Sequence, residues 1–100
     1  MVADLILCNG RVVDGTGELP AFVADVAVSS RSGLIVDIGG HLVTKYPQAR
    51  TIDVSNNIIT PGFVDIHTHF DAQVFWDPLL SPSTGHGVTT VVFGNCGVGF

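Results

Sequence analysis

Short apolar runs separated by turn-forming residues make up most of the first 60 positions of the chain. The strands that this pattern predicts cover residues 5–8, 11–13, 22–28, 34–38, 51–54 and 58–59. Asn9-Gly10 ends the first run as a hairpin turn does, and two later runs alternate around Asp25 and Asp37 as strands with one buried face do. Because no stretch here repeats with the roughly 3.6-residue period of a long helix, we expect a small β-sandwich or partial barrel without any helix longer than two turns.

The pattern changes after Pro61-Gly62. Residues 63–67 form an apolar run with a polar end, and residues 88–93 form a second run that is β-branched almost throughout. Continuous runs of this kind are typical of parallel strands covered on both faces. Between them, the sequence allows one helical turn that ends at Gly87. The pattern therefore predicts a β-rich N-terminal lobe, a partial β-sandwich, over residues 1–60, and the first two strands of an incomplete α/β barrel over residues 61–100.

Composition and charge exclude several classes of partner. The chain is 46% hydrophobic and carries four basic against nine acidic residues, so it can bury a core but has no basic stripe for nucleic acid. Neither a signal peptide nor an apolar run of roughly 18 residues is evident, and we expect a cytoplasmic protein without a membrane partner. Two cysteines far apart, Cys8 and Cys96, do not suggest a disulfide framework.

The chemistry in the sequence centres on His67 and His69, at the polar end of the first barrel strand. Side chains two residues apart on a strand leave the same face, with Cα atoms about 6.6 Å apart, which lets two imidazoles converge on one metal ion. Taken alone, the pair is a weak signal, and two partly exposed imidazoles in a polar loop are then the favoured interpretation. Cys96 ends the next strand, and a thiolate with imidazoles suits zinc, although a buried structural cysteine is the alternative.

A longer stretch of sequence around these residues resembles a known family. The segment Pro61-Gly62-Phe63-Val64-Asp65-Ile66-His67-Thr68-His69 is similar to the opening-strand signature of the amidohydrolase superfamily. Residues 70–73, 76–78, 86–90 and 94–100 are similar to its D-aminoacylase branch, the N-acyl-D-amino-acid deacylases. The resemblance is dense over residues 61–100 and looser over the first 60.

The resemblance implies a (β/α)8 barrel and a metal-dependent hydrolase of non-peptide C–N bonds, with N-acyl-D-amino acids as small-molecule substrates. It assigns His67, His69 and Cys96 as ligands of one or two zinc ions, with another divalent metal as the alternative, and Cys96 stands where many relatives use a carboxylated lysine. The family's catalytic aspartate and further histidine ligands come from later strands, beyond Phe100. We therefore expect no catalytic residue within this 100-residue chain, and no activity from the fragment alone.

Weaker candidates and rival functions remain open at the level of the sequence. Asp71, Gln73 and Asp77 follow the histidines and are candidates for orienting an imidazole or contacting substrate, or are ordinary polar loop residues. One rival is a cyclic-amide hydrolase similar to dihydropyrimidinases and hydantoinases, although those usually take a bridging lysine from a later strand, so Cys96 favours the deacylase. The other rival is a truncated, non-catalytic module that binds metal or a partner. The sequence gives no indication of oligomeric state.

Overall fold

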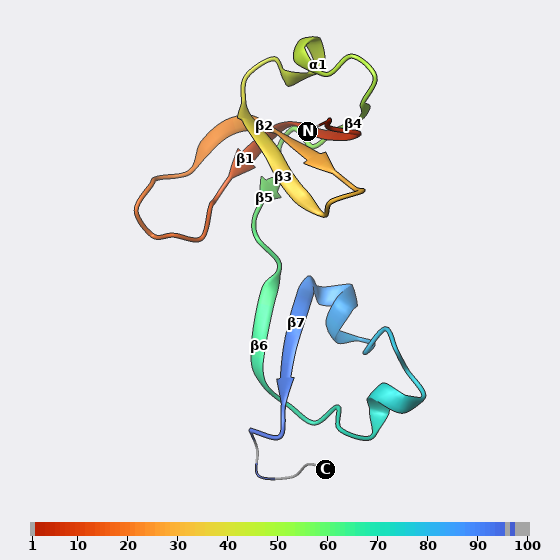
Figure 1. Cartoon of the computed structure of the whole chain (residues 1–100). Helices are drawn as coiled ribbons and strands as arrows, with labels where there is room; N and C mark the ends of the chain where they lie inside the picture. The colour runs from red at the N-terminus through yellow and green to blue at the C-terminus, as the bar shows by residue number, and fades with distance from the viewer. Residues whose placement is uncertain (1, 96, 98–100) are drawn as a thin grey trace. The chain divides into compact units, whose positions relative to one another are not determined.

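The computed structural model describes residues 2–95 and 97 of the chain. The chain divides into two compact units, an N-terminal unit of Met1–Pro61 and a C-terminal unit of Gly62–Phe100. Each unit is built around its own β-sheet (Figure 1). None of the helices in the described part of the chain is long and apolar enough to cross a membrane.

The N-terminal unit is a mixed sheet with one short helix. Its elements are β1 Leu5–Val12, β2 Phe22–Ser29, β3 Leu34–Gly39, α1 Leu42–Lys45, β4 Arg50–Asp53 and β5 Ile58–Ile59. The strands lie in the order β3-β2-β1-β4, and β5 also pairs with β1. The hairpin-connected pairs β1–β2 and β2–β3 are antiparallel, whereas β4 and β5 run parallel to β1. The prediction of a β-rich lobe without a helix longer than two turns is confirmed.

One prediction for this unit is wrong: Asn9-Gly10 is not a hairpin turn but an irregularity inside β1. The pairing with β2 shifts register between Leu7 and Gly10, and Asn9 has a positive φ of 61°. The carboxylate of Asp25 on β2 accepts the Asn9 N–H at 2.9 Å, so the chain bends there and continues along β2 instead of reversing. The bend also divides the outer edge of β1, which pairs first with β4 and then with β5.

Buried side chains pack on both faces of this sheet. One cluster contains Ala3, Ile6, Cys8, Ala27 and Leu42, and the other contains Val12, Ala24 and Val26. Leu42 belongs to α1, so the helix covers the first cluster, in which Ile6 and Ala27 are fully buried. Within the described residues this unit is therefore one sheet with a helix on one face, and not two facing sheets.

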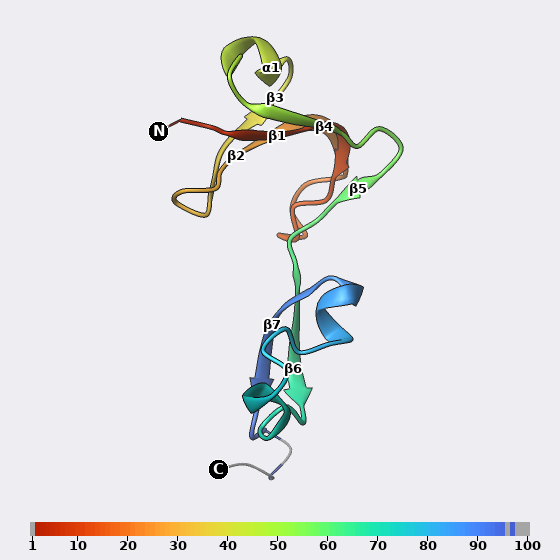
Figure 2. The same cartoon turned by 90° about the vertical axis from the view of Figure 1, so that its right-hand side faces the viewer.

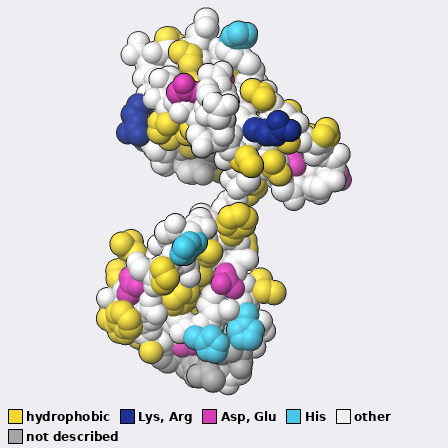
Figure 3. Space-filling model, turned by 180° about the vertical axis from the view of Figure 1, so that it is seen from behind, with side chains coloured by type: hydrophobic (Ala, Val, Ile, Leu, Met, Phe, Trp, Pro, Cys, Tyr) yellow, Lys and Arg dark blue, Asp and Glu magenta, His cyan; other side chains and the backbone are white. Residues whose placement is uncertain are grey.

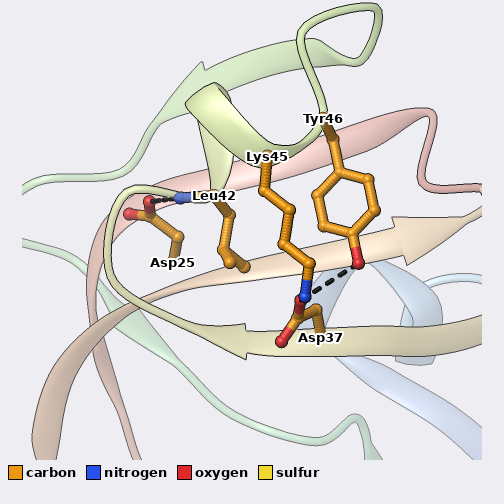
Figure 4. Close-up of polar contacts among 5 residues, drawn as sticks. All are labelled: Asp25, Asp37, Leu42, Lys45 and Tyr46. Carbon is orange, nitrogen blue, oxygen red and sulfur yellow. Dashed lines mark hydrogen bonds and ion pairs between the residues drawn. The ribbon is translucent and has the colours of Figure 1, made fainter.

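Helix α1 is held to the sheet by two aspartates (Figure 4). At its start, the Asp25 carboxylate accepts the backbone N–H of Leu42 at 3.1 Å. At its end, Lys45 Nζ lies 2.5 Å from Asp37 Oδ2, and the Tyr46 hydroxyl donates to the same oxygen at 3.0 Å. The hydrogen bond from Lys45, followed by that from Tyr46, lowers the pKa of Asp37 below its ordinary value.

The C-terminal unit pairs two parallel strands, β6 Phe63–Thr68 and β7 Val88–Phe93, whose arrows point the same way in both views (Figures 1 and 2). The connection between them contains only two short 3-10 helices, η1 Gln73–Phe75 and η2 Ser83–His86. Gly87, with φ 86°, ends η2 and confirms the predicted helical turn and its stop.

The apolar side chains of β6 and β7 are largely exposed within this unit. Phe63, Val64 and Ile66 are 59%, 59% and 65% exposed, and hydrophobic side chains are visible on the surface of the unit in Figure 3. The sequence predicted strands covered on both faces. In the described part of the chain, the two strands and their connection leave much of this apolar surface open.

Candidate metal centre

The two histidines of the predicted site lie where β6 ends. His67 is the second-last residue of the strand, and His69 is the first residue after the strand ends at Thr68. Both are exposed. Their imidazole rings stack with centroids 5.5 Å apart and planes inclined at 29°. The two side chains therefore lie next to each other at the carboxyl end of a parallel strand.

The spacing of the rings fits two ligands of one zinc ion. Zinc–nitrogen bonds are about 2.0–2.1 Å long, and adding the distance from nitrogen to ring centre puts the centroids of two ligating imidazoles about 5–6 Å apart. The observed separation of 5.5 Å falls in that range. Neutral imidazoles are also a preferred donor for this metal. His67 and His69 therefore fit a zinc ion by distance and by donor type.

A β-bulge in β6 lies directly at this pair. Asp65 pairs with Val91 and Thr68 with Phe93, so Ile66 and His67 together lie opposite the single residue Val92. At a bulge, regular ladder pairing is interrupted and the direction of the side chains changes. The position of His67 relative to β7 is therefore set by the bulge as well as by the strand itself.

Three side chains make hydrogen bonds around the bulge. Asp65 Oδ1 accepts the backbone N–H of His67 at 3.1 Å, and Asn95 Nδ2 donates to the carbonyl of Ile66 at 2.9 Å. The hydroxyl of Thr68, which is only 5% exposed, donates to the carbonyl of Val92 at 3.0 Å. We call Asp65, Thr68 and Asn95 the bulge clamp.

Sequence reasoning missed the bulge clamp almost entirely. Asp65 and Thr68 entered only as part of the segment that resembles the family signature, and neither they nor Asn95 were given a role. The only signal available was that polar residues stand between and beside the candidate ligands, in His67-Thr68-His69 and in Asn95-Cys96. Partners 24 and 29 residues apart in the chain are visible only once the two strands are paired.

Cys96, the third predicted ligand, lies outside the described residues, so its distance from the histidines stays a prediction. Among residues 2–95 and 97, no group of three or more His, Cys, Asp or Glu side chains is arranged to hold a metal ion. The geometry of the described site is thus that of two imidazole donors.

The weaker candidates Gln73 and Asp77 are bonded to each other in the loop after β6. Asp77 Oδ2 accepts the Gln73 side-chain amide at 3.0 Å and the backbone N–H of Ser81 at 2.8 Å. The same amide of Gln73 donates to the Ser81 carbonyl at 2.8 Å. These contacts give both residues a role in holding the loop. Asp71 is half-buried at the start of this loop. Any role for the three in orienting a histidine stays a prediction.

Both histidines lie in the part of the chain that matches the model of a known protein family. The model of the amidohydrolase family matches residues 50–99, which include both histidines. The chain is 40% identical over 96 residues to N-acyl-D-aspartate deacylase from Alcaligenes xylosoxydans xylosoxydans, a match that covers 96% of the chain and 18% of that protein.

Solved structures give the same picture. N-acyl-D-glutamate deacylase from Bordetella bronchiseptica, complexed with zinc and a phosphonate mimic of the tetrahedral intermediate, matches with 38% identity and a TM-score of 0.84, over 99% of the chain and 20% of that structure. A D-aminoacylase structure matches with 40% identity and a TM-score of 0.84, over 97% of the chain and 19% of that structure. The chain thus spans about a fifth of the length of these relatives.

Proposed function

Because the chain belongs to the amidohydrolase family and resembles its N-acyl-D-amino-acid deacylases, we propose that it supplies the first metal ligands of an enzyme that hydrolyses the amide bond of N-acyl-D-amino acids. The observation that carries this proposal is the adjacent pair of His67 and His69 rings at the carboxyl end of β6. In α/β barrels, residues at the carboxyl ends of the strands form the active site. We accordingly take β6 and β7 as the first two strands of a barrel that begins near residue 61, after a lobe over residues 1–60.

In the proposed site, His67 and His69 would hold a zinc ion through one imidazole nitrogen each, and Cys96 would provide a thiolate ligand. A metal ion held there would supply Lewis-acid chemistry for the attack of water on the amide carbonyl. In this chain both imidazoles lie next to each other and are exposed at the end of β6. Hydrolysis adds water across the C–N bond and yields a carboxylate and a free amino acid.

The proton for the leaving amine is assigned to an aspartate of a later strand, beyond Phe100. Proton transfer by a positioned side chain typically contributes about 10²–10⁴-fold to the rate. The 100-residue chain is therefore expected to bind metal without turnover, and the proposed activity belongs to a chain of the length of its relatives.

Metal binding by the 100-residue chain tests the first step of the proposal. Zinc affinity would be measured by competition with a chromophoric chelator for the wild type, the His67→Ala/His69→Ala variant and a His86→Ala control, which removes an exposed histidine at the end of η2. We expect the double variant to lose at least about tenfold in affinity, as loss of a ligand should exceed the loss of a residue that orients one. Equal affinity in the wild type and the double variant would contradict the site.

The substrate is tested in a chain extended to the length of the relatives. Amine release from N-acetyl-D-aspartate, N-acetyl-D-glutamate and their L-enantiomers would be compared with ring opening of hydantoin. We expect zinc-dependent release from the D-compounds that is lost in His67→Ala/His69→Ala. Ring opening without release from the D-compounds would identify a cyclic-amide hydrolase instead.

A further inference from the structure

The bulge at Ile66 and His67 interrupts the pairing of β6 with β7. It lies at the position where the direction of the His67 side chain decides whether the imidazole can reach a metal ion shared with His69. A shift of one residue in strand pairing turns a side chain to the opposite face of the sheet. The bulge places two residues of β6 opposite Val92. If this end of the strand slipped into regular pairing, His67 would change its direction relative to its neighbours. Something other than the ladder must fix the bulged register.

We infer that Asp65, Thr68 and Asn95, the bulge clamp, are positioning residues that hold the bulge at the end of β6 and thereby aim His67 and His69 at one metal ion. The inference rests on the proposed function, because it presumes that the two histidines are ligands. It adds residues that act through the histidines and do not themselves touch metal or substrate.

The three hydrogen bonds are distributed so that each fixes a different part of the bulge. Asp65 holds the N–H of His67 itself, and Asn95 holds the carbonyl of the preceding residue, Ile66. The peptide group between Ile66 and His67 is therefore held by a side chain at each polar atom. This is the peptide whose rotation would change the direction of the first histidine.

Thr68, which lies between the two histidines in sequence, fixes the register of β6 against β7. Its side chain is buried, and its hydroxyl reaches across to the carbonyl of Val92, the residue opposite the bulge. Thr68 is buried, whereas its neighbours His67 and His69 are exposed, so its side chain lies apart from the two imidazoles. The buried hydroxyl bonded across the sheet thus anchors the backbone between the two histidines.

Asn95 connects this peptide to the end of the neighbouring strand. It stands two residues after the end of β7 and immediately before Cys96 in sequence. Its bond to Ile66 joins the segment that carries the first histidine to the segment that carries the proposed thiolate ligand. Positioning residues of this kind typically contribute about 10–100-fold to metal affinity.

The test uses pairs of variants in which one member removes the hydrogen bond and the other restores it. Thr68→Val removes the hydroxyl at nearly constant shape, and Thr68→Ser keeps it. Asp65→Ala removes the acceptor, and Asp65→Asn keeps a carbonyl oxygen. Thr90→Val, on the exposed part of β7, removes a hydroxyl away from the bulge and is the control.

Zinc affinity and the visible spectrum of the cobalt(II)-substituted chain would be measured for all five variants. We expect Thr68→Val and Asp65→Ala to weaken zinc binding by about 10-fold or more and to change the cobalt spectrum. Thr68→Ser, Asp65→Asn and Thr90→Val should stay within about threefold of the wild type, below that range. Unchanged affinity and spectrum in Thr68→Val and Asp65→Ala would overturn the inference, while loss of binding in His67→Ala/His69→Ala would leave the proposed function standing.

A measurement without metal covers the case in which Thr68→Val does not fold. Amide hydrogen exchange of the His67 N–H would be followed by NMR in the metal-free Asp65→Ala and Asp65→Asn chains. We expect exchange to accelerate about tenfold in Asp65→Ala, as for loss of one hydrogen bond, and to remain slow in Asp65→Asn. Equal protection in both variants would show that Asp65 does not hold this peptide and would contradict the clamp.

Discussion

Asp25 binds the first residue of helix α1: its carboxylate accepts the backbone N–H of Leu42 at 3.1 Å. The other carboxylate oxygen accepts the N–H of Asn9 at 2.9 Å, at the irregularity in β1. Asp25 is only 6% exposed. One buried side chain on β2 therefore fixes both the bend of the central strand and the start of the helix that covers the sheet.

Replacing Asp25 should destabilise the N-terminal unit. Asp25→Ala leaves the backbone N–H groups of Asn9 and Leu42 without their acceptor, and an unpaired buried group such as that of Leu42 typically costs about 1–3 kcal/mol. We expect a loss of free energy of unfolding in this range, measured by urea denaturation. Asp14→Ala is the matched control, because among the described residues Asp14 accepts hydrogen bonds from Thr16 in its own loop. A stability equal to that of the control would contradict the role of Asp25.

Gly10 is required where β5 packs against β1. A Cβ added at Gly10 would overlap the side chain of Ile59 and would touch Val54 at 3.0 Å. Gly10→Ala should therefore destabilise the chain by about 1–3 kcal/mol, as overpacking of a core does. Gly40→Ala is the control, since a Cβ there meets nothing within 4 Å among the described residues. Thermal unfolding of both variants checks the difference, and a Gly10→Ala chain as stable as Gly40→Ala would show that Ile59 can move aside.

The strands could be predicted because their signal is local. Alternation around Asp25 and Asp37, and the β-branched run at residues 88–93, each identify a strand without knowledge of its partner. The prediction at Asn9-Gly10 was wrong for the same reason: the dipeptide favours a turn, but the long-range acceptor Asp25 stabilises a bend within one strand. The local sequence does not show that Asp25 will lie beside Asn9.

The site was predictable only in part. The spacing of His67 and His69 specifies a common side of one strand, which requires no tertiary information. The bulge that aims them depends on two long-range hydrogen bonds. Thr68 bonds to Val92, 24 positions away, and Asn95 bonds to Ile66, 29 positions away. Such contacts exist only after β6 and β7 have paired.

The ion pair of Asp37 with Lys45 should make the pKa of Asp37 depend on Lys45. Lys45 lowers the pKa of Asp37 first by its hydrogen bond, and Tyr46 does so second. Because the folded-state pKa is lowered, the stabilisation is present above the unfolded pKa of about 3.9 and is lost as pH falls through the folded value. Lys45→Gln should raise the pKa of Asp37 more than Tyr46→Phe does, as followed by NMR of the carboxyl carbon.

The stabilisation by the ion pair of Asp37 with Lys45 is also lost at alkaline pH, when Lys45 loses its proton. Asp37 raises the pKa of Lys45, so this contribution is present below the unfolded lysine pKa of about 10.4 and is lost as pH rises through the folded value. If Tyr46→Phe shifted the titration of Asp37 as much as Lys45→Gln, the charge of Lys45 would not be the main cause.

The contacts of Asp77 predict a local effect on the loop after β6. Asp77→Ala removes the acceptor for both Gln73 and Ser81, so we expect faster proteolytic cleavage within residues 73–81. Zinc affinity should stay within about threefold of the wild type, less than the typical change for residues that orient a ligand. Loss of zinc affinity by about tenfold or more would instead show that Asp77 orients a histidine, as the sequence allowed.

The two cysteines should differ in their reactivity and in their response to zinc. Cys8 is 9% exposed, and burial, followed by the charges of Asp25 and Asp53, raises the pKa of its thiol. Since the thiolate is the reactive form, a raised pKa leaves less of it at pH 8, and iodoacetamide should modify Cys8 slowly with or without zinc. Peptide mass spectrometry would follow Cys8 and Cys96 separately in the native and the urea-unfolded chain.

Zinc should protect Cys96 if it is the thiolate ligand. A metal-bound sulfur is less available to an alkylating reagent, and its protection should depend on the other ligands of the same ion. We therefore expect zinc to slow modification of Cys96 in the wild type and in His86→Ala, but not in His67→Ala/His69→Ala. Cys8 serves as the internal control, because its reactivity is set by burial in the N-terminal unit. Protection of Cys96 that persists in the double variant would mean that it binds zinc apart from the two histidines, and no protection in the wild type would remove Cys96 from the site.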